Sequence, residues 1–332
     1  MKSSSPSLRE IAERAGVSTM TVSRALRGLP KVSEARRAHI LKIAEEMGYR
    51  PDPRISQLMA HLRQGRAAAG TSTLAWLTPH DEERRLENRG YRMGLLEGAR
   101  RRAEKLGYVL DVISFHKGGL KPERCHRILE ARGIQGVIIS PLGSRDNRLE
   151  VPLEDFAVAS LGFALEEPRF HRVGENFFED TQLALERLAI RGCRRVGVVL
   201  GMDPKQHMVE HVLGAWAGWC VRERMPIPEP LVCTPLREVD VKDWFEREKP
   251  DGIVGNVDLR KWVPRRVKRV RVGLFSGEEV IPGVVPDLAA IGSAVVDMVV
   301  AQILRNEKGV PRERKTMLLS GILREFDSLD KP

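Results

Sequence analysis

Short apolar runs of strand length alternate with longer stretches of helical periodicity from residue 73 to the C-terminal region. The expected strands are residues 74–78, 108–115, 136–140, 157–162, 195–200, 231–234, 252–256, 270–275 and 316–322. The expected helices are residues 89–106, 121–132, 178–191, 207–224, 239–248 and 287–305. This alternation is typical of parallel sheets that carry helices on both faces. Some nine strands in roughly 255 residues predict two such α/β sheets side by side.

Residues 8–28 have a different pattern, that of two short helices joined by a tight turn. Each helix has one apolar face at helical spacing, made of Leu8, Ile11, Ala12 and Ala15 in the first and of Val22, Ala25 and Leu26 in the second. Gly16 can adopt the left-handed backbone with which helices often end, and Ser18 is a good N-cap for the second helix. The second helix would present small, polar and cationic side chains outward, a surface that suits a DNA major groove.

A third helix is expected over residues 34–47, with Ser33 as its N-cap and Gly48 as its stop. Its inward face would consist of Ile40, Leu41, Ala44 and Met47. Three short helices with few aromatic side chains make a small core. We therefore expect a head of this size to be only marginally stable.

The net charge of +10 is unevenly distributed along the chain. Residues 1–66 contain 13 Lys and Arg but 6 Asp and Glu, which leaves +7 there and only +3 on the remaining 266 residues. A basic head on a nearly neutral body indicates a polyanionic partner for the head. A basic tail would give the same count, but the helical periodicity of the head favours a folded domain.

Cysteine spacing and hydropathy indicate a cytoplasmic protein. The four cysteines, at positions 125, 193, 220 and 233, lack the spacing of a zinc site or a disulfide framework, which fits reduced thiols in a cytosol. The N-terminal segment is polar and no apolar region follows it, so we expect no signal peptide. No run of about 18 apolar residues occurs, so we expect no membrane-spanning helix.

Enzyme motifs are missing from the sequence. It contains no GxSxG, no phosphate-binding loop, no HExxH and no GxGxxG followed by a suitable acid. His207 and His211 would share one helix face, but no glutamate completes an HExxH pattern, so we predict neither a metal nor a cofactor. A Rossmann-like enzyme, or a small-molecule receptor without DNA regulation, is the alternative, and neither explains residues 8–62.

The string Ile11-Ala-Glu-Arg-Ala-Gly-Val-Ser-Thr-Met-Thr-Val-Ser-Arg-Ala-Leu26 closely resembles the helix-turn-helix of the lactose-repressor (LacI/GalR) family of bacterial transcription regulators. It matches the pattern AxxAGVSxxTVSRxL at nearly every fixed position. Weaker matches follow in order at Asn176-Phe177 through Ala184, Gly192-Cys-Arg-Arg-Val-Gly-Val-Val, Pro250-Asp-Gly-Ile and Ile291-Gly-Ser-Ala-Val-Val-Asp. The resemblance implies a helix-turn-helix head, a hinge helix and a periplasmic-binding-protein-like body of two parallel-sheet α/β subdomains with a ligand cleft between them.

The resemblance also implies which residues contact DNA. Thr19, Met20 and Arg24 would reach base edges, Arg24 by a bidentate bond to guanine and Met20 by contact with a thymine methyl. A phosphate contact alone is the alternative role for Arg24. Main-chain amides near Ser7 and Leu8 would bond phosphates. The expected set is Ser7, Leu8, Ser18, Thr19, Met20, Thr21, Ser23, Arg24, Arg27, Arg54 and Leu58.

Residues 51–63 correspond to the hinge helix of the family. Asp52 is a good N-cap, and Pro53 falls at the first helical position, where its missing amide costs nothing. A helix of about ten residues is too short to be stable alone, so this segment needs a partner to fold on. In the family the twin segment of a dimer supplies it, and a leucine, here Leu58, enters the minor groove and bends the duplex. Alternatively, Leu58 simply belongs to a small apolar face.

Three polar groups of the family's sugar-binding members are replaced in this chain. His211 stands where they have an arginine, Val257-Asp258 where they have an Asn-Asp pair, and Phe275 where they have an aspartate. The resemblance therefore implies either a different, more apolar effector or a cleft that has lost its ligand. Candidate effector-binding residues are His80, His211, Trp216, Asp258 and Phe275, with ordinary surface or core roles as the alternative.

The expected domains are a DNA-binding head (1–50), the hinge helix (51–63), a linker (64–72) and the body (73–332). Within the body, the N-subdomain would span about 73–165 plus part of 287–315, and the C-subdomain about 166–286 plus the C-terminal strand. We expect a regulator, by the family's usual sign a repressor, that binds a near-palindromic double-stranded DNA operator as a homodimer and responds to an unknown small-molecule effector. It would reside in the cytoplasm, on the nucleoid when bound.

Overall fold

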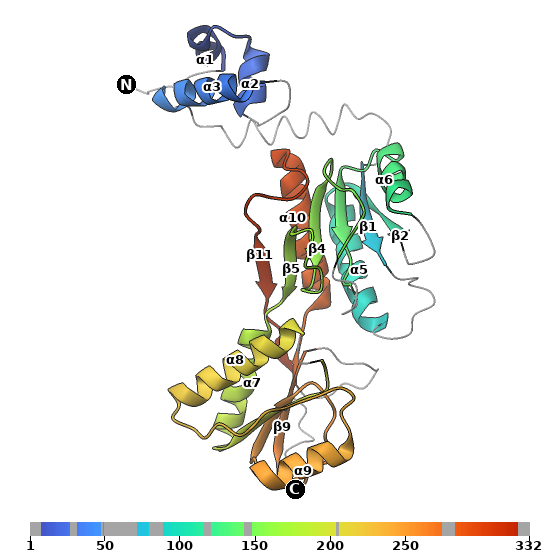
Figure 1. Cartoon of the computed structure of the whole chain (residues 1–332), viewed down its shortest axis with the longest axis vertical. Helices are drawn as coiled ribbons and strands as arrows, with labels where there is room; N and C mark the ends of the chain where they lie inside the picture. Colours follow the sequence, from blue (N-terminus) through green and yellow to red (C-terminus); the bar gives the residue numbers. More distant parts are fainter. Residues whose placement is uncertain are drawn as a thin grey trace.

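The computed structural model describes residues 8–26, 32–47, 49, 72–79, 89–115, 121–142, 148–203, 206–273 and 283–324. Within these residues the chain forms a helical head and a body that contains two six-stranded sheets (Figure 1). The expected all-α head and the expected α/β body are both confirmed.

The head consists of α1 (Leu8–Ala15), α2 (Thr19–Leu26) and α3 (Glu34–Glu46). Its core is formed by Ile11, Ala12, Val22, Ala25, Ile40, Ile43 and Ala44. Leu41 was expected inside but is 44% exposed. The inward stripe of α3 instead runs through Ile43, which lies three residues after Ile40 and therefore on the same helix face. Ser33 occupies the N-cap position of α3, but its side chain makes no capping bond.

The first sheet has the order β11-β5-β4-β3-β1-β2, and every pairing in it is parallel. Its strands are β1 (Ser72–Thr78), β2 (Tyr108–Ser114), β3 (Gly136–Ile139), β4 (Ala157–Leu161), β5 (His171–Glu175) and β11 (Thr316–Leu319). One face packs on α5 (Arg89–Lys105) and α10 (Leu288–Arg305), and the other packs on α6 (Pro122–Ala131). Helices therefore cover both faces, as the strand and helix alternation predicts.

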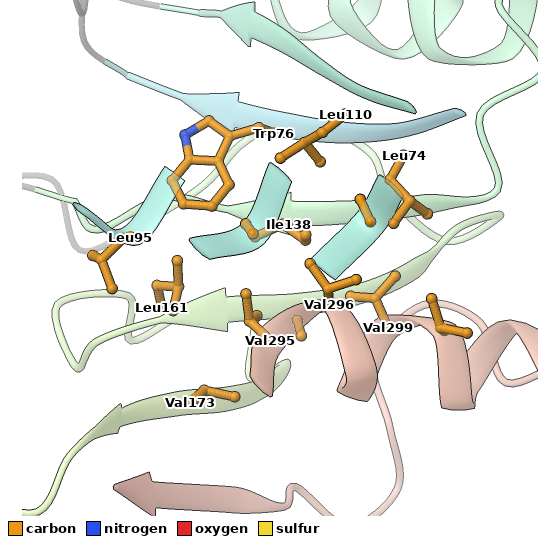
Figure 2. Packing of buried hydrophobic residues seen from close by; sticks show 14 of the residues in the cluster. Leu74, Trp76, Leu95, Leu110, Ile138, Leu161, Val173, Val295, Val296 and Val299 are labelled. Carbon is orange, nitrogen blue, oxygen red and sulfur yellow. The ribbon is translucent and has the colours of Figure 1, made fainter. Parts of the chain in front are cut away.

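Helix α10 supplies much of the core on the first face. Figure 2 shows Val295, Val296 and Val299 pointing at the sheet residues Leu74 and Ile138. By length and composition α10 could also cross a membrane, but 39% of it is buried in the fold. It also carries Asp297, which pairs with Arg102 of α5 at 2.7 Å. These contacts identify α10 as a helix of the α/β core.

The second sheet has the order β12-β10-β9-β8-β6-β7, and it is parallel except for the antiparallel pair β10 and β12. Its strands are β6 (Val196–Leu200), β7 (Leu231–Val232), β8 (Gly252–Gly255), β9 (Lys268–Val272), β10 (Gly283–Val285) and β12 (Ile322–Arg324). Helices α7 (Phe177–Ile190) and α8 (His207–Arg222) cover one face, and α9 (Glu238–Glu248) covers the other.

The chain passes between the two sheets three times: from β5 to α7, from β10 to α10 and from β11 to β12. The first passage therefore follows Glu175, whereas the sequence placed the end of the first subdomain near residue 165. The single strand expected over 316–322 is two strands, one in each sheet. The passages are tied together, because the Asn176 amide donates to the Leu319 carbonyl at 2.9 Å and the Gly321 amide donates to Asp180 Oδ1 at 2.6 Å.

Candidate functional site

The surface of α2 is divided between core and solvent. Val22 and Ala25 are buried, Thr19 is exposed, Met20 is 62% exposed and Arg24 is partly exposed. A large apolar side chain such as Met20 gains nothing from exposure in the free protein. Its position beside a threonine and an arginine suits contact with base edges, which offer both methyl groups and hydrogen-bonding atoms.

The turn before α2 sets the direction of this helix. Gly16 has a φ of +64°, in the left-handed region that favours glycine. The Ser18 Oγ accepts a bond from the Thr21 amide at 3.1 Å, so Ser18 is the expected N-cap. The Ser18 and Thr21 hydroxyls also lie 2.8 Å apart and share a hydrogen bond. The turn and cap predicted from the sequence are therefore both present.

Several of the expected contact residues lie outside the described part of the molecule. These are Ser7, Arg27, Arg54 and Leu58 of the DNA-contacting set, His80 and Phe275 of the effector set, and the side chains of Leu8 and Ser23. The expected hinge helix 51–63 and all but the last residue of the expected linker are outside it as well.

Trp216, expected in the cleft, is a core residue. Its side chain is 2% exposed, and its indole N–H donates to the Val196 carbonyl at 2.8 Å. It therefore fastens α8 to β6, and its only polar atom is already used. Asp258 is also engaged, because both its carboxylate oxygens accept bonds from Arg260 at 2.7–3.0 Å. The Arg260 guanidinium holds the pKa of Asp258 below its usual range.

Three rings meet at the junction of the two sheets, and we call them the ring cluster: Phe163, His207 and His211. Phe163 follows the carboxyl end of β4 in the first sheet, and the histidines lie on successive turns of α8 in the second. The centroids of Phe163 and His207 are 4.2 Å apart, and those of His207 and His211 are 4.3 Å apart. His211 was a candidate from the sequence and His207 was expected on the same helix face, whereas Phe163 as their neighbour was not predicted. The available signal was the Gly162-Phe163 pair at the end of an expected strand.

Buried polar groups surround the same junction. The Tyr91 hydroxyl donates to Glu175 Oε1 at 2.6 Å, and burial raises the pKa of Glu175. Burial also raises the pKa of Asp180 to about 6. Arg172 is 6% exposed, donates to the Leu165 carbonyl at 2.8 Å and has its pKa lowered by burial to about 10. Carboxyl and guanidinium groups in this setting respond to small movements, because their charges are poorly hydrated.

One group of potential metal ligands is present among the described residues. His126, Glu130 and Asp155 bring one ligand atom each to within 4.8 Å of one another. Glu130 and Asp155 are exposed, and exposed acidic groups often lie close together without binding an ion. We therefore assign no function to this group.

Comparison with known proteins finds a family match for the head and more distant similarity over the longer chain. Residues 7–52 match the model of the bacterial regulatory proteins of the lacI family. The HTH-type transcriptional regulator CelR of Thermobifida fusca is 25% identical over 213 residues, which cover 63% of this chain and 59% of that protein. The chain thus spans less than two thirds of the length of this curated relative.

Two solved structures resemble nearly the whole chain. One is a CelR–cellobiose complex, with a TM-score of 0.55 and 19% identity over 96% of this chain and 98% of that one. The other is the Lac repressor dimer bound to operator and the anti-inducer ONPF, with a TM-score of 0.52 and 19% identity over 97% and 98%. At this identity the likeness shows the fold of head and body. The match of residues 7–52 adds that this segment is similar to the lacI family of bacterial regulatory proteins.

Proposed function

We propose that the chain is a sequence-specific DNA-binding transcription regulator, a repressor, that binds a near-palindromic operator as a homodimer. The observation that carries this proposal is the outward face of α2, where Thr19, Met20 and Arg24 leave the core while Val22 and Ala25 hold the helix to it. The relative CelR is named a transcriptional regulator, and the Lac repressor was solved as a dimer on its operator. A dimer would place two copies of α2 on two half-sites.

In this proposal the residues of α2 divide into readers and anchors. Arg24 bonds guanine bidentately, Met20 contacts a thymine methyl, and Thr19 hydrogen-bonds a base edge. Thr21, Ser23 and the amides near Ser7 and Leu8 bond phosphates, and the +7 charge of residues 1–66 draws the head to the duplex. Leu58 bends the operator from the minor groove at its centre.

The domain division belongs to the same proposal: head 1–50, hinge helix 51–63, linker 64–72 and a body that receives a small-molecule effector between its two subdomains. The effector biases the subdomain arrangement that favours DNA binding. His211, Val257 and Phe275 replace polar groups of the sugar-binding members, so the effector differs from their sugars. We also propose that the protein works in the cytoplasm and carries no catalytic site.

The test compares Arg24→Ala with Arg36→Ala, a variant of an exposed arginine on α3 that removes the same charge. Fluorescence anisotropy gives the affinity of each for an operator selected from random DNA and for an unrelated duplex. Arg24→Ala should lower the ratio of the two affinities by about 5- to 150-fold per half-site, because one bidentate pair is lost. Arg36→Ala should weaken both affinities alike. A ratio that Arg24→Ala leaves unchanged would refute the base-reading role.

A further inference from the structure

The Phe163 ring is held firmly on the first-sheet side of the junction. A Cβ atom on Gly174 would lie 2.8 Å from Phe163 Cε2, so the ring packs directly onto the β5 backbone. The guanidinium carbon of Arg172 lies 5.5 Å from the ring centroid. Gly162, with a φ of +71°, makes the turn that brings Phe163 back over the sheet. The ring is therefore a fixed element of the first subdomain.

The other side of the same ring contacts the second subdomain. His207 lies against it at 4.2 Å with an interplanar angle of 32°, and His211 lies at 5.9 Å. Phe177, the first residue of α7, flanks the cluster at 6.4 Å. Phe163 follows β4, and the histidines begin the helix that follows β6. The carboxyl ends of parallel strands are where α/β proteins bind ligands. Here this chain's own rings make the contact between the two ends.

Charged and titratable groups from α8, from β5 and from the segment before β11 act on His207. Glu210 of α8 approaches its Nδ1 at 3.6 Å and favours the charged ring. Burial, His211, Arg172 of β5 and Arg314 before β11 oppose it, and they lower its pKa. A protonated ring is attracted to the face of Phe163, but Arg172 already lies over that ring. A charge on His207 would also lie beside the His211 ring, whose centroid is 4.3 Å away.

We propose that the ring cluster of Phe163, His207 and His211 is a latch that holds the two subdomains together without a ligand, and that protonation of His207 releases it. Any effector must then displace or accommodate this contact, so the latch sets the subdomain arrangement of the free protein. That the arrangement governs DNA binding rests on the proposed function; the latch itself does not.

The experiment measures the distance between the two subdomains in the full chain by double electron–electron resonance between two spin labels. The labels replace two exposed residues, Glu104 of α5 and Asp243 of α9, in a Cys233→Ser background, since Cys233 is partly accessible and the other cysteines are buried. Spectra are recorded at about pH 8 and about pH 5.5, on either side of the ordinary histidine pKa. DNA is absent, so the outcome does not depend on whether the chain binds an operator.

Four proteins distinguish the latch from ordinary packing. The wild type should show one short distance at about pH 8 and a longer population at about pH 5.5. Phe163→Leu should shift the ratio of open to closed forms by about 2- to 10-fold at the higher pH, the value of an aromatic pair. Phe178→Leu, which removes an exposed ring of α7 outside the cluster, should behave as wild type. A His207→Phe/His211→Phe double variant keeps the rings but cannot titrate, so it should stay closed at both pH values.

Two results would overturn the proposal. One is a wild-type distance that is the same at both pH values. The other is a double variant that opens on acidification as the wild type does, because the responding group would then lie elsewhere. Far-UV circular dichroism checks the folding of each variant. Should the double variant not fold, the wild-type distances at the two pH values still test the proposal. The distances in Phe163→Leu and Phe178→Leu test it as well, and equal distances in these two variants would count against the latch.

Discussion

The contact between α5 and α10 makes a sharp stability prediction for Gly98→Ala. A Cβ atom on Gly98 would lie 2.5 Å from the Ala289 Cα and 2.7 Å from its carbonyl carbon, where ordinary contact begins at 3.4 Å. The obstacle is backbone, which cannot rotate away. On the facing helix, a Cβ on Gly292 would lie 2.9 Å from the Ala99 amide nitrogen. The two helices therefore touch backbone to backbone, and an added methyl must push them apart by about 1 Å.

The magnitude follows from two opposing effects. Overpacking a close contact costs about 1–3 kcal/mol, and the rigid obstacle here puts the cost at the upper end, about 3 kcal/mol. Alanine recovers about 1 kcal/mol because glycine is the poorer helix former. The net loss in the free energy of unfolding is therefore about 2 kcal/mol. For a body of this size that corresponds to a fall of about 4–8 °C in the melting temperature.

A matched substitution separates the steric effect from the helix propensity. Gly218 lies within α8 and is exposed, and a methyl group added there would meet no described atom within 4 Å. Gly218→Ala should therefore raise the free energy of unfolding by about 0.5–1 kcal/mol. Differential scanning calorimetry of the wild type and both variants gives the comparison. If Gly98→Ala melts at or above the wild-type temperature, the close packing of α5 on α10 is refuted.

Three further predictions concern the junction, the sheet edge and the operator. Tyr91→Phe removes the hydrogen-bond donor to the buried Glu175, so it should lower the free energy of unfolding by about 1–3 kcal/mol at neutral pH. The loss, measured by calorimetry, should shrink on acidification because the Glu175 carboxyl takes up a proton. A loss that stays constant would contradict this. His171 Nδ1 accepts a bond from the Lys315 amide, and burial lowers the His171 pKa. Its contribution should be complete above about pH 6.5 and lost as pH falls through the lowered pKa, so the melting-temperature difference between wild type and His171→Gln should fade with acid. A constant difference would count against it. Leu58→Ala should reduce the bend at the centre of the operator, measured by energy transfer between DNA ends; an unchanged bend angle would rule out the minor-groove role of Leu58.

Local signals in the sequence were enough to predict most of the fold. In the head, Gly16 and Ser18 act through their own backbone and hydroxyl, and both do what their residue types predict. In the body, buried strands such as β3 and β6 are continuous apolar runs. The position of Leu41 was predicted wrongly because Leu41 and Ile43 are both apolar and close in sequence. Ile43 lies on the buried face of α3 with Ile40, and Leu41 does not.

Strands β5 and β10 were not predicted from the sequence. Strand β5 has the sequence His171-Arg-Val-Gly-Glu175, which contains three polar side chains yet is wholly buried. Glu175 and His171 bond to Tyr91 and Lys315, which are remote in sequence, and Arg172 bonds to the carbonyl of Leu165 seven residues before it. The run 316–322 reads as one strand because nothing local marks the passage between sheets at Ser320-Gly321.

The turn and cap that orient α2 were predictable from the sequence, whereas the surroundings of the candidate residues in the body were less so. Trp216 shares its helix face with Val212, Trp219 and Cys220, a stripe that already marks it as core. The ring cluster joins residue 163 to residues 207 and 211, and only the passage of the chain between the two sheets brings them together. Contacts of that kind have no signal in a single sequence.

Selection of binding sites from a pool of random DNA by the purified protein tests whether this head reads DNA sequence. At near-physiological salt, a near-palindrome with a pyrimidine–purine step at its centre should be enriched, since such steps bend most easily. Two half-sites would report the dimer, and the central step would report the hinge. Recovery of unenriched DNA, at a salt concentration where the protein still binds nonspecifically, would contradict the claim that this head reads sequence.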